Sequence, residues 1–260
     1  MDGLSPPPQL LDAYGAWSWT LAWDNAPNIR TWSLDGPDGQ HIYLKVARHR
    51  YPSIADEAER MRWAGQFLPV PRVIESGSNT DVAWLVTRAM PGMNAVTPPL
   101  LADPATLVPI LARGLLRFHS APMQACPFDF RVDRALDHVR RRLVTGAVDV
   151  ENDLHPEHRH LGLNELLPEL ERLRPRSEDL VVCHGDYCLP NVLIEGDQVT
   201  SFVDLGGRGV ADRWWDLAVA TWSVTWNVGP GWEGAFLDAY GIERDDARIE
   251  FYRLLYDLVS

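Results

Sequence analysis

Residues 181–206 of this 260-residue chain read VVCHGDYCLPNVLIEGDQVTSFVDLG. Asp186 is followed five positions later by Asn191, and Asp204 begins an Asp-Leu-Gly segment thirteen positions after that. A carboxylate can orient a hydroxyl nucleophile and accept its proton, and Mg²⁺ prefers hard oxygen ligands such as Asp and Asn side chains. The stretch therefore predicts phosphoryl transfer from a metal-bound triphosphate. Asp186 is the expected catalytic residue, and Asn191 and Asp204 are the expected metal ligands.

Kinases of the protein-kinase type place the same three groups at this spacing. Each residue has a simpler explanation when taken alone: Asp186 as a loop cap, Asn191 as a helix cap and Asp204 as part of a hairpin turn. Their combination between β-rich runs favours the catalytic interpretation. We expect the neighbouring His184 to be a structural hydrogen-bonding residue, and Cys183 and Cys188 to be small buried side chains.

A lysine and a glutamate upstream complete the expected nucleotide site. Residues 41–46 alternate as a strand does, with an apolar face opposite Lys45. A helix is predicted from an N-cap at Ser53 to about Phe67, and Glu57 lies beside its apolar stripe. A carboxylate near a packed face needs a partner, and Lys45 is the obvious candidate. In kinases such a pair holds the lysine against the α- and β-phosphates, although Lys45 alone could be an ordinary solvated lysine.

The pattern along the chain predicts two lobes. Residues 1–90 contain β-rich runs and one helix, whereas residues 91–260 are mostly helical with a few short strands around the motif. The fold class is therefore α+β, a two-lobed protein-kinase-like fold with a small β-rich N-terminal lobe and a larger helical C-terminal lobe. Strands are expected at 17–23, 29–34, 41–46, 82–87, 180–183, 192–194 and 199–203, and helices around 106–118, 135–143, 165–173, 212–224, 233–240 and 246–259.

The composition limits the classes of partner. Hydrophobic residues make up 46% of the chain, enough for a packed core, and the formal net charge of −12 disfavours nucleic acid and anionic membranes. The same charge would attract cationic ligands. No apolar run approaches a membrane span, and the three cysteines have no metal-ligand spacing. We expect a cytoplasmic protein with reduced thiols, as a monomer or weak dimer.

Two features of protein kinases are missing from the sequence. The segment from Arg208 to Trp215 is too short for a long activation loop, and no Gly-x-Gly-x-x-Gly precedes the first lobe's second strand. The turn that ends at Asn28 would have to meet the phosphates through backbone N–H groups. We therefore expect a small-molecule substrate rather than a protein.

At this point the sequence resembles the aminoglycoside 3′-phosphotransferase family over nearly its whole length. The resemblance implies ATP (with GTP left open) and Mg²⁺, and transfer of the γ-phosphate to a hydroxyl, the 3′-OH, of a cationic antibiotic as a means of resistance. It assigns residues 87–90, namely Thr87, Arg88, Ala89 and Met90, to the hinge beside the adenine. The segments that carry it are 43–45, 56–57 with Trp63, 68–71, 83–86, 126–129, 182–191, 209–213 and 251–255.

The resemblance also places acidic residues around the antibiotic. Glu157 matches a position that lines the acceptor site, and Asp153 belongs to the same acidic stretch. Relatives carry two adjacent acids near the C-terminus, but the matching residues are Tyr256 and Asp257, so one charge remains.

Two further departures concern the substrate and the phosphates. The family's Arg after Asp-x-Gly is replaced by Gly207, with Arg208 one position later. The segment from Trp222 to Trp226 is aromatic where relatives often have acids, which favours stacking on a less charged antibiotic or a sugar ring.

Two alternatives therefore stay open. One is a kinase of the same fold that phosphorylates another hydroxylated antibiotic or small metabolite. The other is a nucleotide-binding pseudokinase, which the complete set of catalytic groups disfavours.

Overall fold

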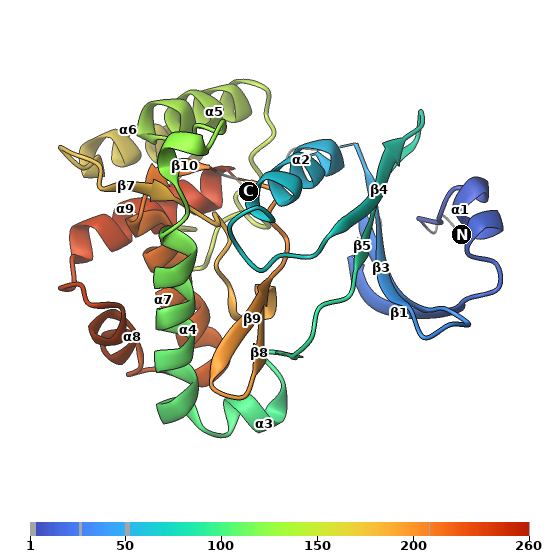
Figure 1. The fold of residues 1–260 in the computed structure, drawn as a ribbon. Helices are drawn as coiled ribbons and strands as arrows, with labels where there is room; N and C mark the ends of the chain where they lie inside the picture. The colour runs from blue at the N-terminus through green and yellow to red at the C-terminus, as the bar shows by residue number, and fades with distance from the viewer. Residues whose placement is uncertain (1–3, 26–27, 50–52, 208, 260) are drawn as a thin grey trace. The chain divides into compact units, whose positions relative to one another are not determined.

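The computed structural model describes residues 4–25, 28–49, 53–207 and 209–259. The chain forms two compact units, shown in Figure 1. The first comprises Met1–Gly92 together with Thr200–Gly207, and the second comprises Met93–Val199 together with Arg208–Ser260. Arg208 lies outside the described residues.

The first unit is built on a five-stranded antiparallel sheet with the order β1-β2-β3-β5-β4. The strands expected from alternation and β-rich composition are present. The structure adds β4, which the sequence did not reveal because its burial does not alternate regularly. Gly77 of β4 lies against Trp84, where a Cβ atom would come within 2.4 Å of the indole ring. The strands are β1 Ser18–Asn25, β2 Ile29–Asp35, β3 His41–Arg48, β4 Val73–Ser78 and β5 Val82–Arg88.

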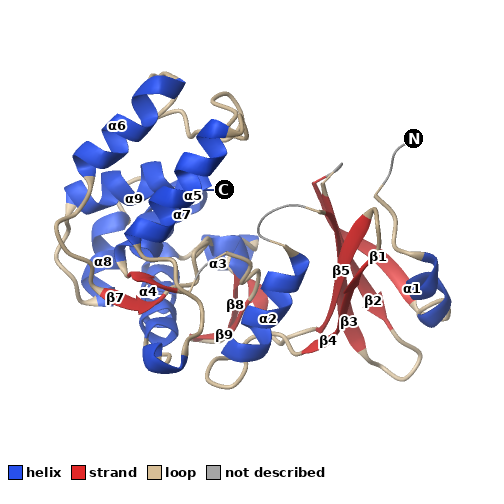
Figure 2. Ribbon diagram, turned by 90° about the horizontal axis from the view of Figure 1, so that it is seen from above, coloured by secondary structure: helices blue, strands red, loops and turns tan. Residues whose placement is uncertain are grey.

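The two faces of this sheet have different coverings, as Figure 2 shows. One face carries Ile42, Leu44 and Val46, which are buried with Leu10 of the unpredicted helix α1 Pro8–Ala13. The other face carries Lys45 and lies toward helix α2 Ile54–Ala64. Ser53 caps this helix in a capping box with Asp56, as its sequence indicates. The alternation in β3 therefore directs Lys45 to the α2 side.

The second unit is mostly helical, and its helix α7 is buried along most of its length against α4, α8 and α9. Helix α7 begins at Trp214 rather than at Asp212, because Asp212 belongs to β10 and its carboxylate accepts the Trp214 N–H. The helices are α3 Pro98–Leu101, α4 Pro104–His119, α5 Val132–Val144, α6 Leu163–Leu173, α7 Trp214–Val228, α8 Glu233–Tyr240 and α9 Asp246–Val259. Among the described residues, no helix combines the length and the apolar character needed to cross a membrane.

Short strands of the second unit frame one loop. Strand β7 Leu180–Val182 pairs with β10 Val210–Asp212, and β8 Val192–Glu195 lies between β6 Met93–Asn94 and β9 Gln198–Phe202. Residues 183–191 connect β7 to β8 and contain the Asp186–Asn191 motif. The β-rich runs on either side of the motif are thus confirmed as strands that fix both ends of this loop.

Candidate active site

Lys45 forms the centre of a charged cluster in the first unit. Its Nζ atom donates to Glu57 Oε2 at 2.9 Å and to Asp204 Oδ1 at 2.9 Å. Burial alone would lower the pKa of Lys45, but the charges of Asp204 and Glu57 raise it above its ordinary value. The ammonium group is therefore charged at neutral pH. The ion pair with Glu57 was expected, whereas the contact with Asp204 was not foreseen.

The two carboxylates of this cluster differ in their surroundings. Glu57 is 5% exposed and serves to hold the ammonium group. The Asp204 side chain is 47% exposed, so one face of it can meet a ligand. Asp204 has a φ of +62°, which is unusual for a residue with a side chain and is found mainly at turns and functional sites.

The residues expected to meet the nucleotide base and phosphates also lie in the first unit. Thr87 is buried in β5, and the backbone N–H groups of Arg88 and Ala89 donate to Arg72 O and His41 O. Met90 follows directly and is half-buried. Asn28 directly precedes β2 and is exposed, and its N–H donates to Asn25 O, while residues 26–27 of the expected turn lie outside the described residues. The segment 87–90 thus comprises the last two residues of the inner strand β5 and the two residues that follow it.

In the second unit, Asp186 and Asn191 are joined directly. Asn191 Nδ2 donates to Asp186 Oδ2 at 2.9 Å and to the Asp186 backbone carbonyl at 3.0 Å. Tyr256 of α9 donates its hydroxyl to the other carboxylate oxygen, Oδ1, also at 2.9 Å. The carboxylate is therefore oriented from both sides, and the Asn191 amide nitrogen is used within the loop.

The donor set suits a hard divalent cation. Because Asn191 uses its nitrogen to hold Asp186, its carbonyl oxygen is the atom that can serve as a ligand. Asp204 contributes a carboxylate that is half exposed. Mg²⁺ is commonly held by one or two such groups together with phosphate oxygens and water. Each side chain by itself offers an oxygen that suits such an ion, and the metal-binding role of both residues stays a prediction.

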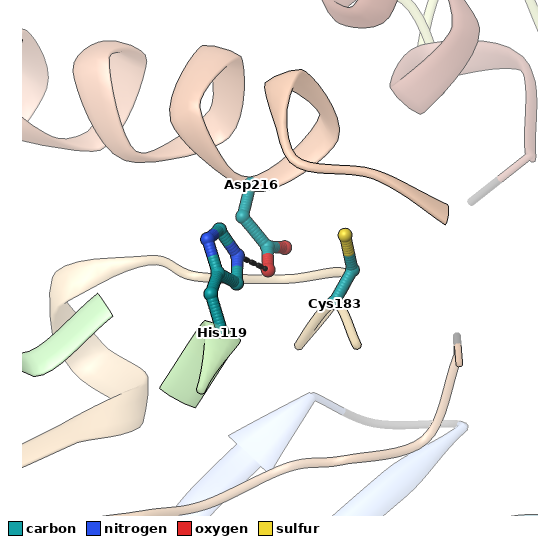
Figure 3. Close-up of side chains that lie close together, drawn as sticks. All are labelled: His119, Cys183 and Asp216. Carbon is teal, nitrogen blue, oxygen red and sulfur yellow. Dashed lines mark hydrogen bonds and ion pairs between the residues drawn. The ribbon is translucent and has the colours of Figure 1, made fainter. Parts of the chain in front are cut away.

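Asp216 anchors the catalytic loop, a role that the sequence did not suggest. Its fully buried carboxylate accepts the backbone N–H groups of His184 and Gly185, each at 2.7 Å, and the ring of His119 at 2.9 Å. Figure 3 shows the contact with His119 and the nearby thiol of Cys183. Burial alone would raise the pKa of Asp216, but the hydrogen bond and charge of His119, with the backbone donors, lower it.

Burial raises the pKa of the Cys183 thiol well above its ordinary value. The thiol therefore stays protonated at neutral pH. We interpret His119, Cys183 and Asp216 as a structural support for the catalytic loop. Only the three-dimensional meeting of α4, α7 and the loop reveals it.

Other contacts fix the same loop to the helices around it. Tyr187 is buried and donates its hydroxyl to Leu111 O at 2.8 Å, and the Leu189 N–H donates to Ser223 Oγ at 2.9 Å. The His184 ring packs against Phe118 and is close enough to accept from the Asp186 N–H at 3.3 Å. The expected structural role of His184 agrees with these contacts. The loop is thus held at nearly every residue, and the Asp186 carboxylate has little freedom to move.

The three acids expected to bind the antibiotic are placed differently from one another. Asp257 is buried, and its carboxylate accepts from the His155 N–H at 2.9 Å and from the His158 ring at 2.6 Å. Asp153 is paired with Arg142 at 3.0 Å. Glu157 has a side chain that is 54% exposed, and it lines a cavity of about 210 Å³. Glu157 is therefore the acid of this set with the most surface available to a ligand.

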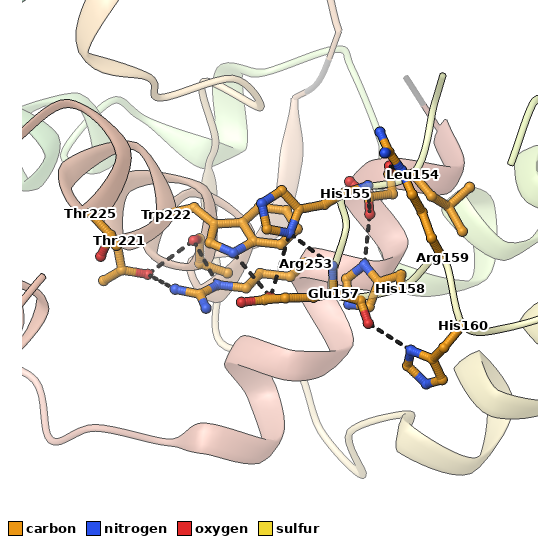
Figure 4. A network of polar contacts seen from close by, with 12 residues as sticks. Leu154, His155, Glu157, His158, Arg159, His160, Thr221, Trp222, Thr225 and Arg253 are labelled. Carbon is orange, nitrogen blue, oxygen red and sulfur yellow. Dashed lines mark hydrogen bonds and ion pairs between the residues drawn. The ribbon is translucent and has the colours of Figure 1, made fainter. Parts of the chain in front are cut away.

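An aromatic cluster adjoins Glu157. Trp222 donates its indole N–H to Glu157 Oε2 at 3.2 Å and stacks on Trp226, with ring centroids 5.1 Å apart. His155 lies 4.5 Å from the Trp222 ring centroid, and Arg253 lies over the same indole at 5.1 Å. Figure 4 shows Trp222 with Glu157, His155 and Arg253. Trp226 is 50% exposed, so the cluster presents an indole at the surface of the second unit.

Comparisons with known proteins agree with this geometry. Residues 28–252 match the family model described as the phosphotransferase enzyme family. An aminoglycoside 3′-phosphotransferase from Streptomyces fradiae is 39% identical over 235 residues, covering 85% of this chain and 87% of that protein. A streptomycin 3″-kinase from Streptomyces griseus is 38% identical over 258 residues, covering 94% of this chain and 93% of that protein.

Solved structures show the same fold. A crystal structure of an aminoglycoside-3′-phosphotransferase of type VIII matches with a TM-score of 0.86 and 34% identity, over 96% of each chain. An aminoglycoside phosphotransferase from Streptomyces rimosus, in complex with ADP and streptomycin, matches with a TM-score of 0.76 and 28% identity, again over 96% of each chain. The expected kinase-like fold class, with a β-rich N-terminal part and a helical C-terminal part, is confirmed.

Proposed function

Because the chain belongs to the phosphotransferase enzyme family, we propose that it transfers the γ-phosphate of ATP to a hydroxyl of an aminoglycoside antibiotic and so inactivates the drug. The observation that carries the proposal is the Asp186 carboxylate, oriented by Asn191 at 2.9 Å on a loop that Asp216 anchors. Relatives up to 39% identical are named for this activity.

In the proposed reaction each residue has one task. The Asp186 carboxylate orients the acceptor hydroxyl and takes its proton as the new P–O bond forms and ADP leaves. Lys45 neutralises the charge of the α- and β-phosphates, and Glu57 keeps its ammonium group in place. Thr87, Arg88, Ala89 and Met90 lie beside the adenine. The rate enhancement comes from positioning and charge neutralisation rather than from a covalent intermediate.

Asn191 and Asp204 are the proposed ligands of Mg²⁺. When bound, the ion neutralises charge on the β- and γ-phosphates during transfer. Asp204 also accepts from Lys45, so the same carboxylate links the lysine to the metal position. We propose ATP as the phosphate donor, and GTP should be tested as the alternative donor.

The finer proposal concerns the acceptor. The hydroxyl proposed is the 3′-OH, as in the relative from Streptomyces fradiae. Glu157 is the residue best placed to meet a substrate ammonium group, because more than half of its side chain is exposed. Asp153 and Asp257 act through the shape of the site, since their carboxylates are already bonded to Arg142 and His158.

A second candidate follows from the same contacts. Asp257 is paired and Trp226 is exposed. The site therefore offers a ligand fewer carboxylates than the three that were expected, together with one aromatic surface. A hydroxylated antibiotic with fewer ammonium groups would stack on Trp226 instead of pairing with acids. The streptomycin 3″-kinase of Streptomyces griseus shows that similar chains are named for a different regiochemistry.

One assay separates these candidates. Purified protein with ATP and Mg²⁺ is tested for ADP release against kanamycin, neomycin, streptomycin and an unrelated hydroxylated antibiotic, and each product is mapped by NMR. The leading proposal expects a phosphate on the 3′-OH of kanamycin or neomycin. Transfer to streptomycin alone would support the second candidate, and no transfer to any of the four compounds would contradict the proposed function.

A further inference from the structure

Tyr256 contacts the catalytic carboxylate directly. Its hydroxyl lies 2.9 Å from Asp186 Oδ1, while Asn191 Nδ2 lies 2.9 Å from Oδ2. An ionised carboxylate only accepts hydrogen bonds, so the phenol is the donor. We propose that Tyr256 is a positioning residue for phosphoryl transfer, which fixes the orientation of Asp186 toward the acceptor hydroxyl. This inference rests on the proposed function.

The position of the Tyr256 hydroxyl is fixed by its helix. Tyr256 lies in the last turn of α9, between the buried residues Leu255 and Asp257. The Asp257 carboxylate accepts from the backbone of His155 and from the ring of His158. These contacts fix the rotation of the last turn about the helix axis and its position along that axis. The phenol therefore holds the carboxylate from a rigid element rather than from a mobile terminus.

A neutral thiol adjoins the contact. The Cys188 thiol lies among Asp186, Ser223 and Tyr256, and burial raises its pKa well above the ordinary value. A thiol that stays protonated does not compete with Asp186 for the proton of the acceptor.

The contact leaves room for the substrate. Each carboxylate oxygen has about two lone-pair sites. Asn191 uses one site on Oδ2 and Tyr256 uses one site on Oδ1. The acceptor hydroxyl can therefore bind a remaining site while both protein donors stay in place. With one donor removed, the carboxylate can rotate about its side-chain bonds, and a small misplacement of a catalytic group strongly reduces the rate.

The test is steady-state kinetics of Tyr256→Phe, which removes the hydroxyl and keeps the ring. The antibiotic is the best substrate of the wild-type protein. We expect kcat to fall about 10- to 100-fold, the loss associated with a hydrogen bond to a charged group, while KM for the antibiotic and for ATP stay within about threefold. Thermal melting of the variant should match the wild type.

The matched control is Tyr252→Phe, one turn earlier on α9. This substitution also removes a phenol hydroxyl from α9. The buried Tyr252 hydroxyl lies near Asp212, whereas the Tyr256 hydroxyl contacts Asp186. We expect kcat of the control to stay within about threefold of the wild type, because the control leaves the Asp186 contacts intact.

Two results would overturn the inference. The first is a Tyr256→Phe protein with unchanged kcat. The second is a change confined to KM for the antibiotic, which would make Tyr256 an ordinary substrate contact. In both cases the wild-type protein is active, so these results differ from a failure of the proposed function, in which the wild type itself transfers no phosphate.

Discussion

Replacement of Asp216 by alanine should damage both the stability of the second unit and its catalytic loop. The carboxylate is fully buried and accepts from His184 N, Gly185 N and the His119 ring at 2.7, 2.7 and 2.9 Å. Each buried donor left without a partner costs about 1–3 kcal/mol, so the three together give an upper range of about 3–9 kcal/mol. Removing one partner of a buried charged network typically costs about 3–5 kcal/mol, which is the loss we expect.

The assay is urea unfolding followed by circular dichroism, together with antibiotic phosphorylation. Asp216→Ala should lower the free energy of unfolding by about 3–5 kcal/mol, and kcat should fall about 100-fold or more because the loop that carries Asp186 loses its anchor. The control is Asp137→Ala, which removes an exposed ion pair with Arg140 and should cost less than about 1 kcal/mol. A loss below about 1 kcal/mol for Asp216→Ala would show that this carboxylate does not anchor the loop.

The same carboxylate predicts a pH dependence. The pKa of Asp216 is lower in the folded protein than its ordinary value, because its donors favour the charged form. Its contribution to stability is therefore complete above the unfolded pKa and is lost as the pH falls through the lower folded pKa. The difference in unfolding free energy between wild type and Asp216→Ala should consequently shrink below about pH 4. A constant difference from pH 7 to pH 2 would contradict this assignment.

Two further changes test the other parts of the site. Lys45→Met breaks the pair with buried Glu57, so it should destabilise the first unit by about 3–5 kcal/mol and abolish detectable ATP binding in calorimetry. Adding Glu57→Gln should restore most of the stability but not the binding, and recovery of both would argue against the role of Lys45. Trp226→Ala should raise KM for the antibiotic about 3- to 10-fold with little change in melting temperature, because we propose that the exposed indole stacks on the substrate. An unchanged KM would exclude Trp226 from that surface.

Local sequence patterns were sufficient for much of the fold. The alternation in residues 41–46 correctly indicated which face of β3 is buried, and Ser53 with Asp56 correctly marked the start of α2. Such signals depend only on neighbouring residues. Strand β4 was missed because it is irregularly buried and depends on its pairing with β5.

The contacts of the site were predictable only in part. The pair Lys45–Glu57 could be inferred because a buried carboxylate requires a partner. Asp216 and Tyr256 could not be assigned in the same way, because their roles arise where α7 and α9 meet the catalytic loop. The Asp216 contacts span 31 and 32 residues of sequence, and the Tyr256 contact spans 70. The pairing of Asp257 with His158 likewise depends on the register of α9. Long-range packing, rather than local preference, determines these roles.

The proposed function depends on the Asp186 carboxylate, which orients and deprotonates the acceptor hydroxyl. The most direct measurement follows transfer of radiolabelled γ-phosphate from ATP to the antibiotic by wild type and Asp186→Asn, with ATP affinity measured alongside. We expect a loss of kcat of at least about 100-fold with ATP affinity within about threefold of wild type. Wild-type transfer rates in the Asp186→Asn protein would contradict it.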